Sequence, residues 1–244
     1  MSRSFPRSRV RRVPWRFVAP MLVLCGIVAA LVPAVRAARK AAWRAQRANN
    51  LKQIALAPQN YNDVNRCLPP AVIRDSDGRP TSSWRLRIVP FLEGTNFGLD
   101  WRLPWTNAKS YVWEHMTFPF YTYARDSDCG ARWETNVVAL SGPGTAFDSD
   151  RTCTLSEIDR NAILLVEIKG SGIHWAEPRD LDVAEIRESI TRGLDGDGMH
   201  VAFADGAVWF LRKDVPWEDL KKFFTLEGAR QLDRERVLGP YAHW

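Results

Sequence analysis

Residues 17–35 read FVAPMLVLCGIVAALVPAV, and this stretch decides the fold of the chain. It holds 19 residues without a single charge. A helix rises about 1.5 Å per residue, so the stretch would be roughly 28 Å long, close to the hydrocarbon thickness of a bilayer. The sequence therefore predicts a transmembrane helix. A cleaved signal peptide, with small residues near positions 34–38, and a buried core helix are the two alternatives.

Basic residues flank the apolar stretch on both sides. Six residues precede it and five follow it: Arg3, Arg7, Arg9, Arg11, Arg12 and Arg16, then Arg36, Arg39, Lys40, Arg44 and Arg47. These counts do not set an orientation by the positive-inside rule. We expect residues 1–16 to be a basic cytoplasmic tail, because export of the larger folded part is the usual bacterial outcome. The protein would then be a single-pass inner-membrane protein with its C-terminal domain outside the cytoplasm.

The helical pattern continues beyond the apolar stretch. Residues 34–57 read AVRAARKAAWRAQRANNLKQIALA and are rich in strong helix formers. Small and apolar residues recur at steps of three and four, which is typical of one buried face: Ala34, Ala38, Ala41, Ala45, Ala48, Leu51 and Ala55. Pro58 is predicted to end the helix near residue 57. One helix of about 40 residues would thus lie half in lipid and half against a domain formed by residues 60–244.

The net charge of +6 is distributed unevenly. Residues 1–66 hold 13 Lys/Arg and one acid, a net charge of +12, whereas residues 67–244 hold 21 Lys/Arg and 27 Asp/Glu, a net charge of −6. The basic character therefore belongs to the flanks of the apolar stretch. A basic domain face for nucleic acid is not supported.

The pattern after residue 60 predicts an α+β fold with a mainly antiparallel sheet and long loops. Apolar runs typical of strands cover residues 84–92, 135–140, 162–168, 201–204 and 207–211. Asp205 and Gly206 separate the last two runs, which is a strong hairpin signal, and both are expected at positive φ. Residues 180–192 are expected to form a short surface helix. Residues 217–232 are expected to form a C-terminal helix over a sheet edge.

Five blocks of sequence resemble one bacterial family. They are ALVPAVRAARKAAWRAQRANNLKQIALAPQNYND (30–63), LPPAVIRDSDGRPTSSWRLRIVPFLE (68–93), TNVVALSGPGTAF (135–147), LSEIDRNAILLVEIKGSGIHWAEPRDLD (155–182) and GDGMHVAFADGAVWFL (196–211). In this order they resemble the DUF1559 or "H-X9-DG" proteins, which are abundant in planctomycetes. That family is similar to type IV pilins and type II secretion pseudopilins. The resemblance implies an N-terminal helix half embedded in the membrane and an antiparallel sheet packed on its distal half. It also implies a non-enzymatic structural role, in a short fibre or as single copies.

Two positions depart from the family pattern. Pilin-like members begin with a Gly-Phe peptidase site and carry a Glu early in the apolar segment. Arg16 stands at that Glu position here, and no Gly-Phe pair precedes it. This puts processing by prepilin peptidase, and assembly into a fibre, in doubt. In the naming motif, Asp195 stands in place of the His ten residues before Asp205, while Asp205-Gly206 is retained.

A calcium site is the one cofactor hypothesis that the sequence raises. Asp195 and Asp197 are closely spaced in a glycine-rich loop, and calcium prefers several oxygen ligands. The loop lacks the third acidic or amide residue and the downstream Glu of an EF-hand, so a solvated turn is the alternative. We expect no other cofactor.

Enzymatic activity is not expected. The four histidines, His115, His174, His200 and His243, are scattered, and no nucleophile elbow, phosphate loop or HExxH motif occurs. An acid–base site would have to bring together Asp195, His200 and Asp205. The cysteines contain no CxxC pair, and a disulfide such as Cys129–Cys153, which would leave Cys67 unpaired, stays open.

Two functions follow from these features. The first is a membrane-anchored, pseudopilin-like structural or interaction protein of the cell envelope, with lipid, further copies of itself or other envelope proteins as partners. The alternative is a single-copy binding module that presents a ligand or glycan site on its β domain. Trp101 and Trp105 could form such a site if exposed, whereas core packing is their simpler role.

Overall fold

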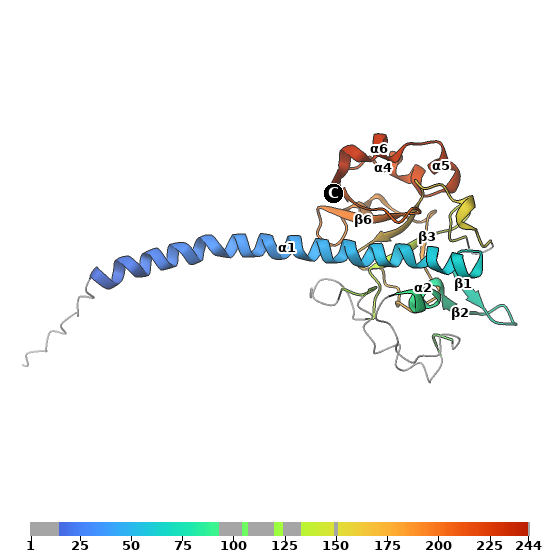
Figure 1. Cartoon of the computed structure of the whole chain (residues 1–244), viewed down its shortest axis with the longest axis horizontal. Coiled ribbons are helices and arrows are strands. Elements are labelled where there is room, and N and C mark those ends of the chain that lie inside the picture. Colours follow the sequence, from blue (N-terminus) through green and yellow to red (C-terminus); the bar gives the residue numbers. More distant parts are fainter. Residues whose placement is uncertain (1–14, 93–103, 107–119, 124–132, 149–150, 244) are drawn as a thin grey trace, which may run out of the picture. The chain divides into compact units, whose positions relative to one another are not determined.

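The computed structural model describes residues 15–92, 104–106, 120–123, 133–148 and 151–243 (Figure 1). The chain divides into two compact units, Met1–Gln46 and Arg47–Trp244. The first long helix begins in the first unit and ends in the second. Both β-sheets and all the short helices lie in the second unit.

Helix α1 (Trp15–Asn65) has 51 residues. In the first unit it contains an 18-residue window with a mean hydropathy of 2.2, none of which is buried. Its exposed large apolar side chains include Met21, Leu22, Val23, Leu24, Ile27, Leu31, Val32 and Val35. The helix is therefore long and apolar enough to cross a membrane.

The predicted end of this helix near residue 57 is wrong, because α1 passes Pro58 and ends at Asn65. A proline in a helix removes one backbone hydrogen bond. Here the turn before Pro58 packs into the core, where Ile54, Ala55 and Ala57 are fully buried, and Pro58 itself is buried. The helix ends where Arg66 takes a left-handed φ of 63° and donates its N–H to the carbonyl of Asn62 at 2.7 Å.

A six-stranded sheet forms the centre of the second unit, in the order β5-β3-β4-β6-β7-β8. Its strands are β3 (Val137–Ser141), β4 (Ile163–Glu167), β5 (Leu181–Asp182), β6 (Gly198–Phe203), β7 (Val208–Arg212) and β8 (Ala242–His243). All neighbours are antiparallel except β3 and β5. A separate antiparallel pair is formed by β1 (Val72–Arg74) and β2 (Pro80–Ser83). The predicted α+β class is confirmed.

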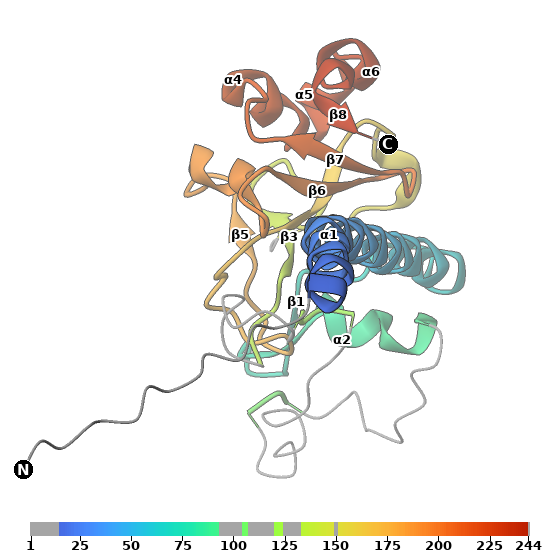
Figure 2. The ribbon, with the colours of Figure 1, turned by 90° about the vertical axis from the view of Figure 1, so that its left-hand side faces the viewer.

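The sheet is covered on both faces. One core cluster joins α1 residues such as Ile54 to inward residues of β3 and β6 such as Ala139 and Ala202. The opposite face, with Val138 and Val201, packs against the C-terminal helices. Those elements are α4 (Trp217–Leu220), η5 (Lys221–Phe223), α5 (Leu226–Arg230), α6 (Arg234–Val237) and η6 (Gly239–Tyr241). In Figure 2, β6 and β7 lie between α1 and these helices.

The strand predicted at residues 84–92 is wrong. This segment forms helix α2 (Trp84–Ile88) followed by the 3-10 helix η1 (Val89–Phe91). It lies on the side of α1 away from the sheet, so that the second half of α1 is buried from two directions (Figure 1). Trp84, Leu86 and Ile88 have no exposed surface. Trp84, Leu86 and Ile88 alternate with Arg85 and Arg87, as in a half-buried strand, but Arg85 is itself buried and paired with Asp180, so the alternation does not mark an exposed face.

Two predicted helices take other forms. Residues 180–192 contain β5 and the 3-10 helix η4 (Glu188–Arg192) rather than one surface helix. Residues 217–232 are divided into α4, η5 and α5. The division falls at Thr225, whose hydroxyl accepts the N–H of Gly228 and so starts a new helix instead of continuing the old one. A further 3-10 turn, η3 (Leu155–Glu157), precedes β4.

Candidate functional site

The Asp205-Gly206 turn joins β6 and β7, as the hairpin signal predicted. The N–H of Gly206 donates to Phe203 O, and the N–H of Phe203 donates to Ala207 O, both at 2.9 Å. Gly206 has φ of +82°, but Asp205 does not have a positive φ, so the expectation of two positive φ values is wrong. A three-residue loop with one left-handed glycine fits this pattern. A Cβ on Gly206 would lie 2.8 Å from Leu56 Cδ2, so the hairpin tip packs on α1.

The carboxylate of Asp205 is bound by Arg234. The two guanidinium nitrogens Nη1 and Nη2 lie 3.0 and 2.5 Å from Oδ1 and Oδ2. Arg234 is buried between this carboxylate and the rings of Phe203 and Trp209, 4.6 and 5.2 Å from its Cζ. Burial alone would raise the pKa of Asp205. The hydrogen bonds from Arg234 and from the N–H of Ala207 outweigh burial and lower the pKa below its ordinary value.

Asp195 belongs to a buried ionic network with α1. Arg47 donates to its two carboxylate oxygens at 3.2 and 2.7 Å, and Arg47 Nε lies 2.7 Å from Glu167 Oε1. The other oxygen of Glu167 contacts Nδ1 of His200. Burial disfavours the charge of Arg47, but Glu167 and Asp195 outweigh it and raise its pKa. Burial, and then the charge of Glu167, raise the pKa of Tyr123 well above its ordinary value.

This network occupies the carboxylate oxygens of Asp195 that a calcium ion would need as ligands. Both oxygens of Asp195 already accept hydrogen bonds from Arg47, which supplies the positive charge that a calcium ion would otherwise bring. The backbone carbonyl of Asp197 accepts the N–H of Lys213. Within the described ranges, no group of three or more His, Cys, Asp or Glu is arranged to hold a metal ion.

The candidate acid–base triple does not converge. Asp195 binds Arg47, His200 contacts Glu167, and Asp205 binds Arg234. Asp195 precedes β6 and Asp205 follows it. A six-residue strand is about 17–20 Å long, so the two carboxylates lie at opposite ends of the strand.

The remaining predicted residues are placed as follows. His243 lies in β8, with its ring 6.5 Å from that of Phe210. His115, Trp101 and Cys129 lie outside the described residues. Cys25, Cys67 and Cys153 are free thiols.

A second buried ion pair was not foreseen. Arg85 of α2 has no exposed surface, and its guanidinium binds Asp180. The other carboxylate oxygen of Asp180 accepts from the indole N–H of Trp84 at 2.8 Å, and the N–H of Ala139 in β3 also donates to this side chain at 2.8 Å. Burial raises the pKa of Asp180, although Arg85 opposes the shift. Arg85 and Asp180 are 95 positions apart, so no local sequence signal indicated this pair.

An aromatic corner surrounds His174. Its ring is stacked between those of Trp133 and Trp175, at centroid distances of 6.0 and 5.9 Å, and Trp105 tilts against it at 5.7 Å. Trp105 is half-buried. Trp175 is adjacent to His174 in the sequence, whereas Trp133 is brought to it by the fold.

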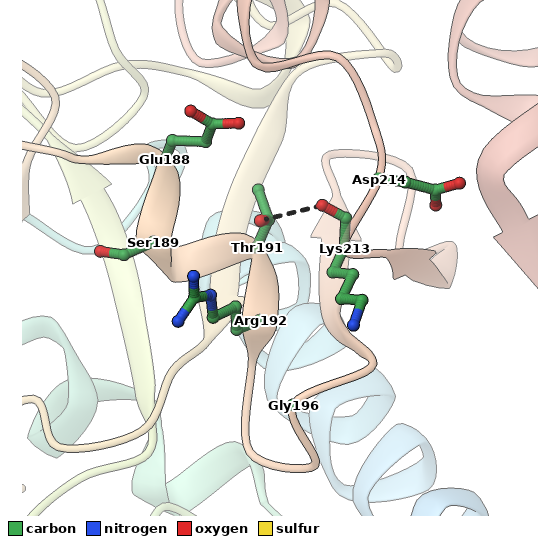
Figure 3. A pocket seen from close by; sticks show the side chains of 7 residues that line it. All are labelled: Glu188, Ser189, Thr191, Arg192, Gly196, Lys213 and Asp214. Carbon is green, nitrogen blue, oxygen red and sulfur yellow. Dashed lines mark hydrogen bonds between the residues drawn. The ribbon is translucent and has the colours of Figure 1, made fainter.

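A surface pocket of about 720 Å³ adjoins the loop that carries Asp195. Figure 3 shows the residues that line it, and the hydroxyl of Thr191 donates to the carbonyl of Lys213 at 3.3 Å. The residues are Glu188, Ser189, Thr191, Arg192, Gly196, Lys213 and Asp214. The charged ends of Glu188, Arg192 and Lys213 point in different directions (Figure 3), so the pocket presents no single converging charge.

The comparisons with known proteins bear on the first part of the chain. The model of the family described as "Protein of unknown function (DUF1559)" matches residues 36–113. This segment, about a third of the chain, is similar to that family. It begins just after the apolar stretch and includes the second half of α1, the β1–β2 pair and α2. The comparisons with curated proteins and with solved structures gave no match.

Proposed function

We propose that the protein is a membrane-anchored, pseudopilin-like interaction protein of the cell envelope. The proposal rests on what helix α1 does in the two units. One helix contributes an exposed apolar stretch to the first unit and fully buried core residues such as Ile54 and Ala55 to the second, where they pack on an antiparallel sheet. The pilins and pseudopilins that the DUF1559 family resembles have an N-terminal helix of this kind.

The apolar stretch would anchor the protein as a single-pass inner-membrane protein. Residues 1–16 would stay in the cytoplasm, and residues 60–244 would lie outside it. The concentration of basic charge around the stretch supports a position between anionic membrane surfaces. The net acidic charge of residues 67–244 argues against nucleic acid as a partner.

The role would be structural rather than enzymatic. The three candidate acid–base residues are each engaged with a different partner, and two of those partners, Arg47 and Arg234, are buried arginines. Such pairs fix the position of α1 and of the β6–β7 hairpin. Arg16 in place of the pilin Glu favours single copies, or contacts with other envelope proteins, over a processed fibre.

Amine-reactive crosslinking in native membranes tests this role. Exposed lysines, among them Lys52 and Lys222, provide reactive groups on α1 and on the C-terminal helices. We expect defined adducts, either with further copies of the chain or with other envelope proteins, which disappear when the same membranes are diluted in detergent before crosslinking. A strictly monomeric species in intact membranes would contradict an interaction role.

A further inference from the structure

A column of four rings runs from the surface into the core of the second unit. The rings of Trp133, His174, Trp175 and Tyr121 follow one another with centroids 6.0, 5.9 and 6.4 Å apart. The angles between successive planes are 16°, 26° and 18°. Trp175 and Tyr121 have no exposed surface, whereas Trp133 is 41 % exposed. The outermost ring is thus supported by rings that the core holds in place.

His174, the second residue of the column counted from the surface, is held in place by hydrogen bonds to its ring and its backbone. Nδ1 of His174 accepts the N–H of Ala176 at 3.1 Å, and the backbone N–H of His174 donates to Glu177 Oε2, also at 3.1 Å. The backbone N–H of Trp175 donates to the carbonyl of Trp133 at 3.0 Å. Trp133 is therefore a pre-organised platform, and a ligand that stacks on it would not have to order the side chain first.

A charged pair lies next to His174, the residue on whose ring Trp133 stacks. Glu177 Oε1 and Arg179 Nε form an ion pair at 2.9 Å, with side chains 21 % and 57 % exposed. Arg179 also donates to the carbonyl of Gly172 at 2.7 Å, which holds the guanidinium at the corner. The corner thus offers one flat apolar surface next to a neutral pair of hydrogen-bonding groups.

The combination of one exposed aromatic ring with a charged pair favours some classes of ligand over others. A protein partner that docks by apolar burial needs a contiguous patch of several exposed apolar side chains. Among the side chains that the structure describes, Trp133 is the one exposed Trp, Tyr or Phe, and the other exposed large apolar side chains described in the second unit, Leu56 and Val64, belong to α1. A ligand with one apolar face and a polar edge fits the corner better.

We propose that Trp133 is the stacking platform of a glycan-binding site that takes a pyranose unit of an uncharged polysaccharide. The C–H groups on one face of the sugar carry partial positive charge, which the negative face of an indole attracts. Hydroxyls at the edge of the ring can donate to Glu177 and accept from Arg179. Because the corner holds two carboxylates, those of Glu177 and of the buried Glu134, against the one guanidinium of Arg179, a neutral glycan fits better than an anionic one.

Isothermal titration of the full chain tests the site, in a detergent without a sugar head group. The probes are the β-1,4-linked hexasaccharides of glucose and of N-acetylglucosamine. We expect saturable binding of at least one probe, and Trp133→Ala should weaken it by up to about tenfold, the upper end of what one aromatic contact contributes. Trp133→Phe should keep part of the affinity, because a phenyl ring still stacks.

A matched control is Trp217→Ala in α4. Trp217 is a half-buried tryptophan whose ring contacts Phe224 at 5.8 Å, in an element that contributes nothing to the His174 corner. This variant should bind as the wild type does, and circular dichroism should show that both variants are folded. The proposal fails if the wild type binds neither hexasaccharide, or if Trp133→Ala binds with unchanged affinity. Either failure would leave the membrane-anchoring proposal standing, because that proposal does not depend on Trp133.

Discussion

Among single residues, Asp205 offers the clearest test of how the hairpin is anchored. Its pKa is lowered chiefly by hydrogen bonds from Arg234, against the opposing effect of burial. A carboxyl group with a lowered folded-state pKa contributes stability above its unfolded pKa of about 3.9, and this contribution is lost as the pH falls through the folded pKa. Asp205→Asn should therefore lower the free energy of unfolding at pH 7 by about 1–3 kcal/mol.

The measurement is urea unfolding of wild type and Asp205→Asn at pH 7 and pH 3. The stability difference should shrink at pH 3, because this pH lies below the unfolded-state pKa of about 3.9 and the contribution of the wild-type carboxylate is being lost there. High salt should reduce the difference only in part, because Asp205 is about one-third exposed while Arg234 is buried. A difference that is the same at both pH values would show that the charge of Asp205 is not what matters.

Local and distant contacts of single residues differ in how far the sequence reveals them. The hairpin at Asp205 and Gly206 was predictable, because turn chemistry depends on adjacent residues. The partner of Asp195 was not, because Arg47 lies 148 residues away along the chain. The same holds for Arg85 and Asp180, which are 95 positions apart. Charge pairs of this kind follow from the fold, and no local pattern marks them.

At the scale of the elements, Gly193, which lies between η4 and β6, should tolerate replacement far less well than an ordinary turn glycine does. Gly193 ends η4 with φ of +54°, and a Cβ there would lie 2.0 Å from the carbonyl oxygen of Gly198. Backbone cannot move aside as a flexible side chain can. Gly193→Ala should therefore cost about 2–5 kcal/mol, from the left-handed conformation and overpacking together, and should loosen the loop that brings Asp195 to Arg47.

Gly78→Ala is the control for this prediction. Gly78 lies in the β1–β2 turn with φ of +80°, but a Cβ there would have no atom within 4 Å. Its replacement should cost only the backbone strain, about 1–2 kcal/mol. Thermal unfolding of both variants by circular dichroism measures the two costs. Equal costs would mean that the approach of Gly193 to Gly198 is not restrictive.

Helices and strands could be predicted where one sequence pattern dominated, but not where packing in the core overrode the local pattern. The apolar stretch and the hairpin strands β6 and β7 follow from length and turn signals. The segment that forms α2 alternates apolar residues with Arg85 and Arg87, and this alternation gave a false strand. Pro58 gave a false helix end, because packing of the turn before it, with Ile54 and Ala57 buried, outweighs the local preference of proline.

For the whole molecule, the decisive question is whether the exposed apolar stretch of α1 is what holds the protein in a membrane. Leu24 and Ile27 are 60 % and 51 % exposed within it, and the stretch has no buried residue in the most apolar window. An Asp near the centre of a transmembrane helix costs about 2.5–3.5 kcal/mol of insertion free energy. The double variant Leu24→Asp/Ile27→Asp should therefore leave the membrane fraction after an alkaline carbonate wash, whereas the wild type stays.

Val64→Asp is the matched control for this experiment, because Val64 is a 70 % exposed apolar residue on the same helix but in the second unit. It should remain in the membrane fraction as the wild type does. If exposed apolar surface anywhere on α1 caused nonspecific retention, both variants would be released to a similar degree. The double variant should also keep the wild-type thermal unfolding of the second unit, since the core residues of α1 begin only at Leu51. Retention of the double variant would mean that the stretch does not anchor the protein, and the pseudopilin-like role would lose its main support.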